Sequence, residues 1–115
     1  MNRSKAKGTA YENELLADLR KIWPAADRAK AGNESCDFVG IPFPIEAKHR
    51  KAWDLRTWIR KIRKVSTDGC WAIFAADGDR RLATSIGDVM VVDREFGMML
   101  LEAGQRVIEL YPVAE

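Results

Sequence analysis

The chain is poor in cysteine and histidine and has no long apolar run, and each shortage excludes a class of protein. Cys36 and Cys70 are far apart with no CxxC pair, and there is one histidine, so neither a disulfide framework nor a zinc site is predicted. No apolar stretch approaches the roughly 20 residues that cross a membrane, and residues 1–8 carry cations with no hydrophobic signal segment behind them. We expect a soluble, intracellular (cytoplasmic) protein with reduced cysteines and no membrane partner.

Internal repeats, low-complexity segments and linkers are also missing. The 115 residues, 47% of them hydrophobic, suffice for one core but are too few for two ordinary domains. We expect a single domain over residues 1–115, a size that suits a phage or a small mobile element.

Acidic residues are scarce between residues 48 and 64. This segment has eight Lys or Arg against one acid, Asp54, whereas residues 65–115 have four cations and nine carboxylates. The asymmetry fits a polyanionic partner such as nucleic acid, because Lys and Arg that contact phosphates release counterions. A helix with a solvated cationic face is the alternative.

Hydrophobic spacing predicts the element order αβββαββα. Helices are predicted at 9–23, 54–65 and 94–104, and strands at 26–32, 36–40, 43–49, 70–77 and 88–93. Residues 107–112 are predicted either to add a last short strand or to pack as a tail. This order indicates an α/β (α+β) fold, with a mixed central sheet flanked by helices.

The strand at 43–49 carries the first candidate site. Side chains alternate along a strand, so Glu46 and Lys48 share one face, about 7 Å apart, while Ile45 and Ala47 can join the core. If a turn near residues 41 and 42 makes a hairpin, Asp37 lies opposite Glu46, within roughly 5 Å.

Two carboxylates this close repel each other unless a positive charge lies between them. Hard oxygen ligands favour Mg²⁺ or Mn²⁺, and such an ion can activate water and neutralise charge on a phosphate, with Lys48 beside it. Two alternatives remain open. Asp37, Glu46 and Lys48 can form an exposed salt-bridge ladder, and Glu12 can form a capping box with Thr9 at a helix N-terminus.

Two segments resemble a known family. The PD-(D/E)xK nuclease superfamily has an acidic residue, a short gap and then an acid-x-Lys triplet. This chain is similar, with Asp37 as the first acid and Glu46, Ala47 and Lys48 as the triplet. Within it, KGTAYENEL (7–15) and IEAKHRK (45–51) resemble the corresponding segments of archaeal-type Holliday junction resolvases. The resemblance covers roughly residues 5 to 65 and, more loosely, the two later strands.

The resemblance implies a restriction-endonuclease-like fold and a set of site residues. It implies that Glu12, Asp37 and Glu46 hold a metal ion together with the backbone carbonyl of Ala47, and that Lys48 is the catalytic lysine. It further implies a homodimer that cuts opposite strands of a four-way DNA junction, whose near two-fold symmetry a dimer matches.

The chain departs from the family pattern in its loops. Family members often carry a serine in the loop before the metal-binding aspartate. Here Asn33 stands at the nearest position and Ser35 lies further on, so either is the candidate phosphate contact. The proline expected beside that aspartate is Cys36. A glutamine often found on the helix after the lysine has no counterpart, and Arg56 and Arg60 occupy that helix.

The predicted function is a Mg²⁺-dependent, structure-selective DNA endonuclease, most specifically a Holliday junction resolvase, with Mn²⁺ as a substitute. The alternatives are a nuclease that acts on flaps, nicks or ends, and a branched-DNA-binding module without catalysis. Phosphate contacts, which read DNA shape rather than bases, are predicted for three groups of cations. They are Arg3, Lys5 and Lys7 in a flexible arm, His49, Arg50 and Lys51 beside the site, and Arg56, Arg60, Lys61 and Lys64 on the second helix.

Overall fold

The computed structural model describes residues 3–30 and 36–111, with side chains of the first helix described from Gly8 onward. The helices are α1 (Arg3–Ile22), α2 (Leu55–Val65) and α3 (Arg94–Leu110). The strands are β1 (Asp27–Arg28), β2 (Phe38–Val39), β3 (Ile45–His49), β4 (Ala72–Ala76) and β5 (Asp88–Val92). The observed order αβββαββα confirms the predicted one.

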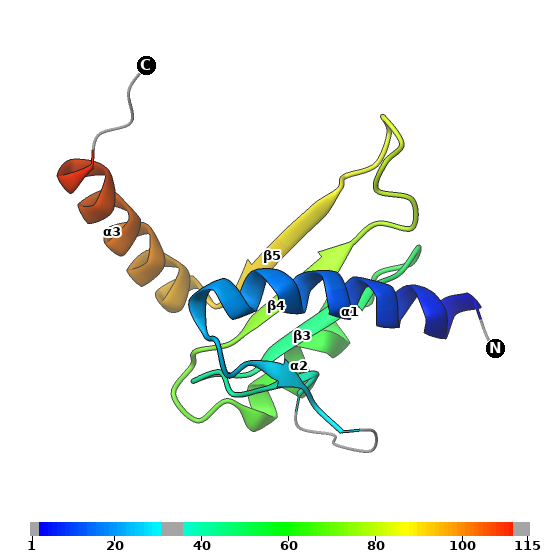
Figure 1. The fold of residues 1–115 in the computed structure, drawn as a ribbon, viewed down its shortest axis with the longest axis horizontal. Helices are drawn as coiled ribbons and strands as arrows, with labels where there is room; N and C mark the ends of the chain where they lie inside the picture. Colours follow the sequence, from blue (N-terminus) through cyan, green and yellow to red (C-terminus); the bar gives the residue numbers. More distant parts are fainter. Residues whose placement is uncertain (1–2, 31–35, 112–115) are drawn as a thin grey trace.

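The strands form two sheets (Figure 1). In the larger, β4 lies in the centre, parallel to β3 and antiparallel to β5. A parallel pair needs a crossover connection, and α2 supplies it between β3 and β4. The small sheet is the antiparallel pair of β1 and β2. The fold is therefore mixed α/β, with a mixed sheet as predicted.

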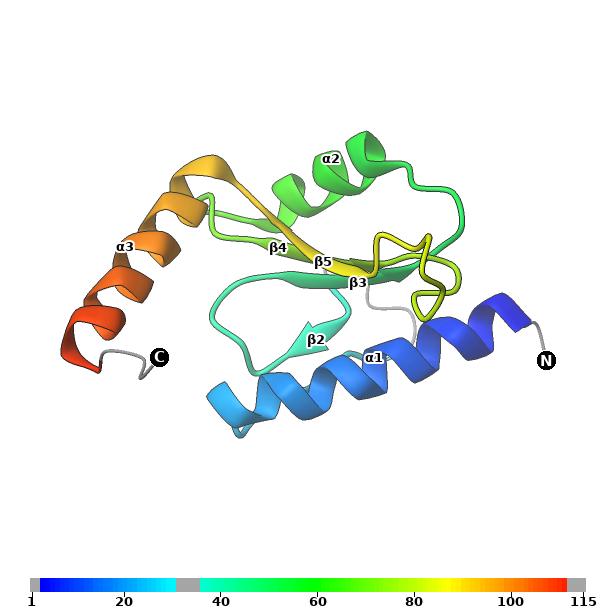
Figure 2. The same cartoon turned by 90° about the horizontal axis from the view of Figure 1, so that it is seen from above.

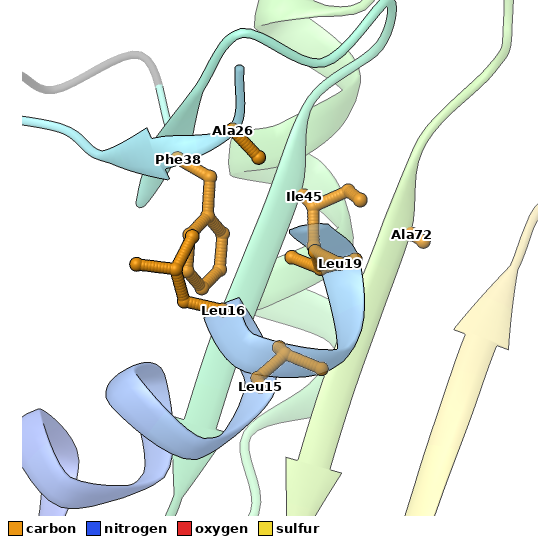
Figure 3. Close-up of a cluster of buried hydrophobic side chains, with 7 residues drawn as sticks. All are labelled: Leu15, Leu16, Leu19, Ala26, Phe38, Ile45 and Ala72. Atoms are coloured by element: carbon orange, nitrogen blue, oxygen red, sulfur yellow. The ribbon is translucent and has the colours of Figure 1, made fainter. Parts of the chain in front are cut away.

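Helices α1 and α2 cover opposite faces of the larger sheet (Figure 2). On the α1 face, Leu15, Leu16 and Leu19 pack against Phe38 and Ile45 (Figure 3). On the α2 face, Ile62 packs against Trp71 and Ile73. Because successive strand residues point to opposite faces, β4 and β5 contribute apolar side chains to both layers, whereas β3 contributes Ile45 and Ala47 to the α1 layer alone.

The ends of two helices differ from the prediction. Helix α1 begins at Arg3 rather than at residue 9. Residues 3–7 have no apolar period, which is why the prediction began later, but their Ala and Lys residues favour a helix. The alternative of a capping box between Thr9 and Glu12 is therefore excluded, since both residues lie inside the helix. Helix α3 continues to Leu110, so the possible strand at 107–112 is also wrong.

The predicted hairpin between 36–40 and 43–49 does not form. Strand β2 pairs with β1, and one backbone bond, from Asp37 N–H to Ile45 O (3.4 Å), joins this segment to β3. Pro42 and Pro44 lack the N–H groups that a hairpin ladder would use. Gly40 in the turn has φ of +76°, and a Cβ there would collide with the carbonyl of Ala25.

The loop between β4 and β5 is fastened to α1. The hydroxyl of Tyr11 donates a 2.5 Å hydrogen bond to Asp88, and Arg80 forms ion pairs with both Glu14 and Asp88. None of the helices over the described residues combines the length and apolarity that a membrane-spanning segment requires.

Ile73 on the central strand is 0% exposed and packs against the α2 layer. We expect Ile73→Ala to lower the free energy of unfolding by about 2–5 kcal/mol, because the surrounding layer cannot close the cavity. Leu82→Ala is the control, since Leu82 is 58% exposed in a loop and its loss should change stability by less than about 0.5 kcal/mol. Urea unfolding measures both, and equal changes would contradict the assignment of the core.

Candidate active site

Strand β3 places Glu46 and Lys48 on the α2 face of the sheet, as the alternation predicted. Ile45 is buried on the other face, where Ala47 also packs against the α1 layer. The Nζ atom of Lys48 lies 3.9 Å from Oε2 of Glu46. The Glu46 side chain is 19% exposed, so this pair is largely shielded from water and is not a fully solvated salt-bridge ladder.

Asp37 reaches the same place from the segment before β2. Its N–H donates to the carbonyl of Ile45, and its Oδ2 accepts a 2.7 Å bond from the N–H of Ala47. Both contacts lie on the edge of β3 that faces away from β4. Because the N–H and C=O of one strand residue point to the same side, the carbonyl of Ala47 also faces Asp37.

The Asp37 and Glu46 carboxyl groups interact directly. Burial is the largest cause of a rise in the pKa of Glu46 to about 8, and the charge of Asp37 and a hydrogen bond with it add to the rise. The Lys48 ammonium opposes these effects without cancelling them. Without a cation, the pair therefore holds a proton at pH values where an ordinary glutamate is ionised.

Glu12 is the third predicted carboxylate, and it lies on α1 beside this pair. Burial and the charge of Asp37 raise the pKa of Glu12, while Arg28 and Lys48 oppose the rise. Arg28 holds the carboxylate with Nε at 3.0 Å and an Nη at 2.8 Å from Oε2. Glu12 thus belongs to the cluster electrostatically but is bound to a guanidinium.

The residues Glu12, Asp37, Glu46 and Lys48 form a charged cluster. Its oxygen donors are those that Mg²⁺ prefers, but their arrangement is not that of a Mg²⁺ site. Three carboxylates and a strand-edge carbonyl are hard oxygen donors, and the raised pKa of Glu46 marks excess negative charge that a cation would relieve. However, no three His, Cys, Asp or Glu side chains among the described residues are arranged as metal ligands. Ligation by Glu12 would require its carboxylate to turn away from Arg28.

A cationic surface adjoins the site. The exposed face of α2 carries five cations, none of which forms an ion pair with a described residue; they are Arg56, Arg60, Lys61, Arg63 and Lys64. Arg50 and Lys51 are exposed just beyond β3. We call the five α2 residues the cationic face of α2. It lies on the sheet face that carries Glu46 and Lys48.

Other predicted phosphate contacts lie elsewhere. Arg3, Lys5 and Lys7 belong to α1 in the backbone, so the predicted flexible arm is wrong. Asn33 and Ser35 lie outside the described residues. His49 points to the α1 face, where its ring lies 5.6 Å from that of Tyr11 and its Nε2 is 3.1 Å from the carbonyl of Gly78.

Two residues near the cluster were not among the predicted site residues. Arg28 contacts Glu12 from β1, and its position in a two-residue strand has no periodic signal. Trp58 packs against the core cluster of Ile62, Trp71 and Ile73, and its ring also faces Lys48.

No protein-family model, no curated protein and no solved structure matches the chain.

The raised pKa of Glu46 predicts how stability depends on pH in the metal-free protein. Between pH 4.5 and about 8, the folded state keeps a proton that the unfolded chain has released. The free energy of unfolding should therefore fall as the pH rises through this window, by at most about 1.4 kcal/mol per pH unit from this group.

Glu46→Gln should remove this part of the dependence, whereas Glu109→Gln, on the exposed side of α3, should retain it. Urea unfolding of the three proteins across the window, with a chelator present, measures the difference. Equal slopes in the parent and Glu46→Gln would contradict the shared proton.

Proposed function

We propose that this chain is a metal-dependent DNA endonuclease of the PD-(D/E)xK type with a restriction-endonuclease-like fold. One observation carries the proposal. The Asp37 and Glu46 carboxyls meet at the edge of β3 that faces away from β4, with the Lys48 ammonium beside them and the cationic face of α2 on the same side of the sheet. The mixed sheet and the β3–α2–β4 crossover are consistent with the fold.

Asp37, Glu46 and the carbonyl of Ala47 would hold Mg²⁺ or Mn²⁺, with Glu12 joining on release from Arg28. Such an ion supplies positive charge to a scissile phosphate and lowers the pKa of water. The Lys48 ammonium is placed to donate a hydrogen bond to a non-bridging phosphate oxygen as charge develops there. The guanidinium of Arg28, once free of Glu12, offers a paired donor to the same anion. The resemblance implies products with a 5′-phosphate and a 3′-hydroxyl.

The cationic face of α2 is suited to hold the DNA backbone. Unpaired Lys and Arg contact phosphates without regard to sequence, so we propose selection by DNA shape. A four-way junction is the preferred substrate because both resolvase-like segments contribute to the cluster, Glu12 from the first and Glu46 with Lys48 from the second. A nuclease for flaps, nicks or ends would use the same site, and a binding module would use the same surface without cleavage.

We propose a homodimer in which α3 contacts a second copy. This helix has no buried residue among those described, and it approaches its own sheet through its first turn, where Phe96 lies 4.9 Å from Phe43. Figure 1 shows it extending away from the sheet. Its apolar residues follow the four-three spacing by which identical helices pack: Phe96, Leu100, Ala103, Val107 and Leu110.

Lys48→Ala should reduce cleavage of a labelled four-way junction in Mg²⁺ by roughly 10²- to 10³-fold and leave junction binding largely unchanged, because the ammonium acts on the transition state. Lys61→Ala is the matched control. It removes an exposed cation from α2, so it should weaken binding and its salt dependence but allow cleavage at saturating protein.

Gel assays on the junction, a flap, a nicked duplex and a linear duplex measure both variants. Near-normal turnover by Lys48→Ala would contradict its role. Paired symmetric cuts in the junction alone identify a resolvase, cuts in the other DNAs identify the broader nuclease, and binding without cleavage in Mg²⁺ and Mn²⁺ identifies a binding module.

Leu100→Glu and Val107→Glu should convert the dimer to a monomer, because each places a charge in the apolar seam of α3. Gln105→Glu, on the opposite side of the helix, should remain dimeric. Sedimentation velocity measures the mass of each protein, and a dimer that survives both seam substitutions would show that another surface joins the copies.

A further inference from the structure

Trp58 connects the candidate lysine to the core of the protein. It lies one turn into α2 and packs, half-buried, beside the cluster of Ile62, Trp71 and Ile73. The centroid of its ring is 5.9 Å from Nζ of Lys48. This is within the range at which an ammonium is attracted to the face of an indole, the aromatic ring that binds cations best.

A second tryptophan supports the first. The ring of Trp53 lies 6.1 Å from that of Trp58 at an angle of 50°. Its Nε1–H donates a 3.0 Å hydrogen bond to the carbonyl of Arg50, just after β3. The indole of Trp58 therefore contacts both the core and Trp53.

The Lys48 ammonium is thus located by two contacts of different kinds. Glu46 attracts it from 3.9 Å on the same strand, and Trp58 attracts it from α2. A lysine side chain has four rotatable bonds, so one carboxylate at this distance does not fix the position of Nζ.

We propose that Trp58 is a positioning residue, which holds the ammonium of Lys48 beside the Asp37 and Glu46 carboxyls. Its role in catalysis rests on the proposed function, whereas the positioning itself does not.

An indole suits this role better than a further carboxylate would. A second acid would neutralise the ammonium and occupy its N–H donors, which the phosphate needs. The ring face attracts the positive charge through its quadrupole and accepts no strong hydrogen bond. Lys48 can therefore be oriented while its donors stay available to an incoming anion.

A spectroscopic test examines the positioning without DNA. In protein labelled with ¹³C and ¹⁵N at lysine, the methylene protons next to Nζ of Lys48 should be shifted upfield by the Trp58 ring. Trp58→Leu should abolish the shift, whereas Trp53→Phe, which removes an indole that does not face Lys48, should retain most of it. Circular dichroism and the amide spectrum verify that each variant is folded. A Lys48 signal unchanged in folded Trp58→Leu would overturn the proposal.

A kinetic test examines the consequence for the reaction. Fluorinated tryptophans placed at position 58 keep the shape of the ring while they withdraw electron density from its face. The kcat for junction cleavage should fall in step with fluorination, by roughly 2- to 30-fold across the series, with KM nearly constant. Trp58→Phe should retain part of the rate that Trp58→Leu loses.

If Lys48→Ala inactivates the protein but fluorination of Trp58 leaves kcat unchanged, the proposed role of the ring is overturned. If the parent cleaves no DNA, the proposed function fails, and the positioning of Lys48 is then decided by the spectroscopic test alone.

Discussion

The hydrogen bond from the N–H of Ala47 to the carboxylate of Asp37 positions the candidate site. A strand at the edge of a sheet has unpaired backbone groups, which normally need another strand or water. Here one of them binds an acidic side chain from a different segment. The edge of β3 therefore brings the Asp37 carboxyl to Glu46 without forming the hairpin that the spacing of the two segments indicates.

The charges around this contact are only partly compensated in the metal-free protein. Arg28 offsets Glu12, and Lys48 offsets Glu46, yet the pKa values of both glutamates remain raised. A site that repels its own negative charge is stabilised by a cation, and the same property makes it sensitive to pH. The proposed ion binding and the expected pH dependence of stability thus have one electrostatic origin.

Helix α2 contributes to both the core and the site. Its buried side supplies Ile62, and its exposed side carries the five residues of the cationic face. Trp58 lies between the two sides and reaches Lys48. Because α2 is also the crossover between β3 and β4, the strand that bears the site and the helix that would hold DNA form one βαβ unit.

The sequence predicted the elements whose residues alternate or repeat against a core. Ile45 and Ala47 alternate with Glu46 and Lys48, and the apolar spacing of α2 identified that helix within one residue at its start. The predicted ends of α1 and α3 were wrong because residues 3–7 carry no apolar period in the sequence and the described residues of α3 are not buried in a core. The β-branched Val107 and Ile108 favour a strand, yet none of the described strands pairs with this segment, and the helix continues with an ion pair between Glu102 and Arg106.

The sequence by itself determined which face of β3 is polar, because the period of a strand is fixed by its backbone. It also determined that cations gather on one helix. Only the tertiary structure decided that Asp37 binds the edge of β3, that Arg28 holds Glu12, and that Trp58 faces Lys48. Each of these contacts joins segments whose separation in space depends on how the layers pack, and no local period encodes that distance.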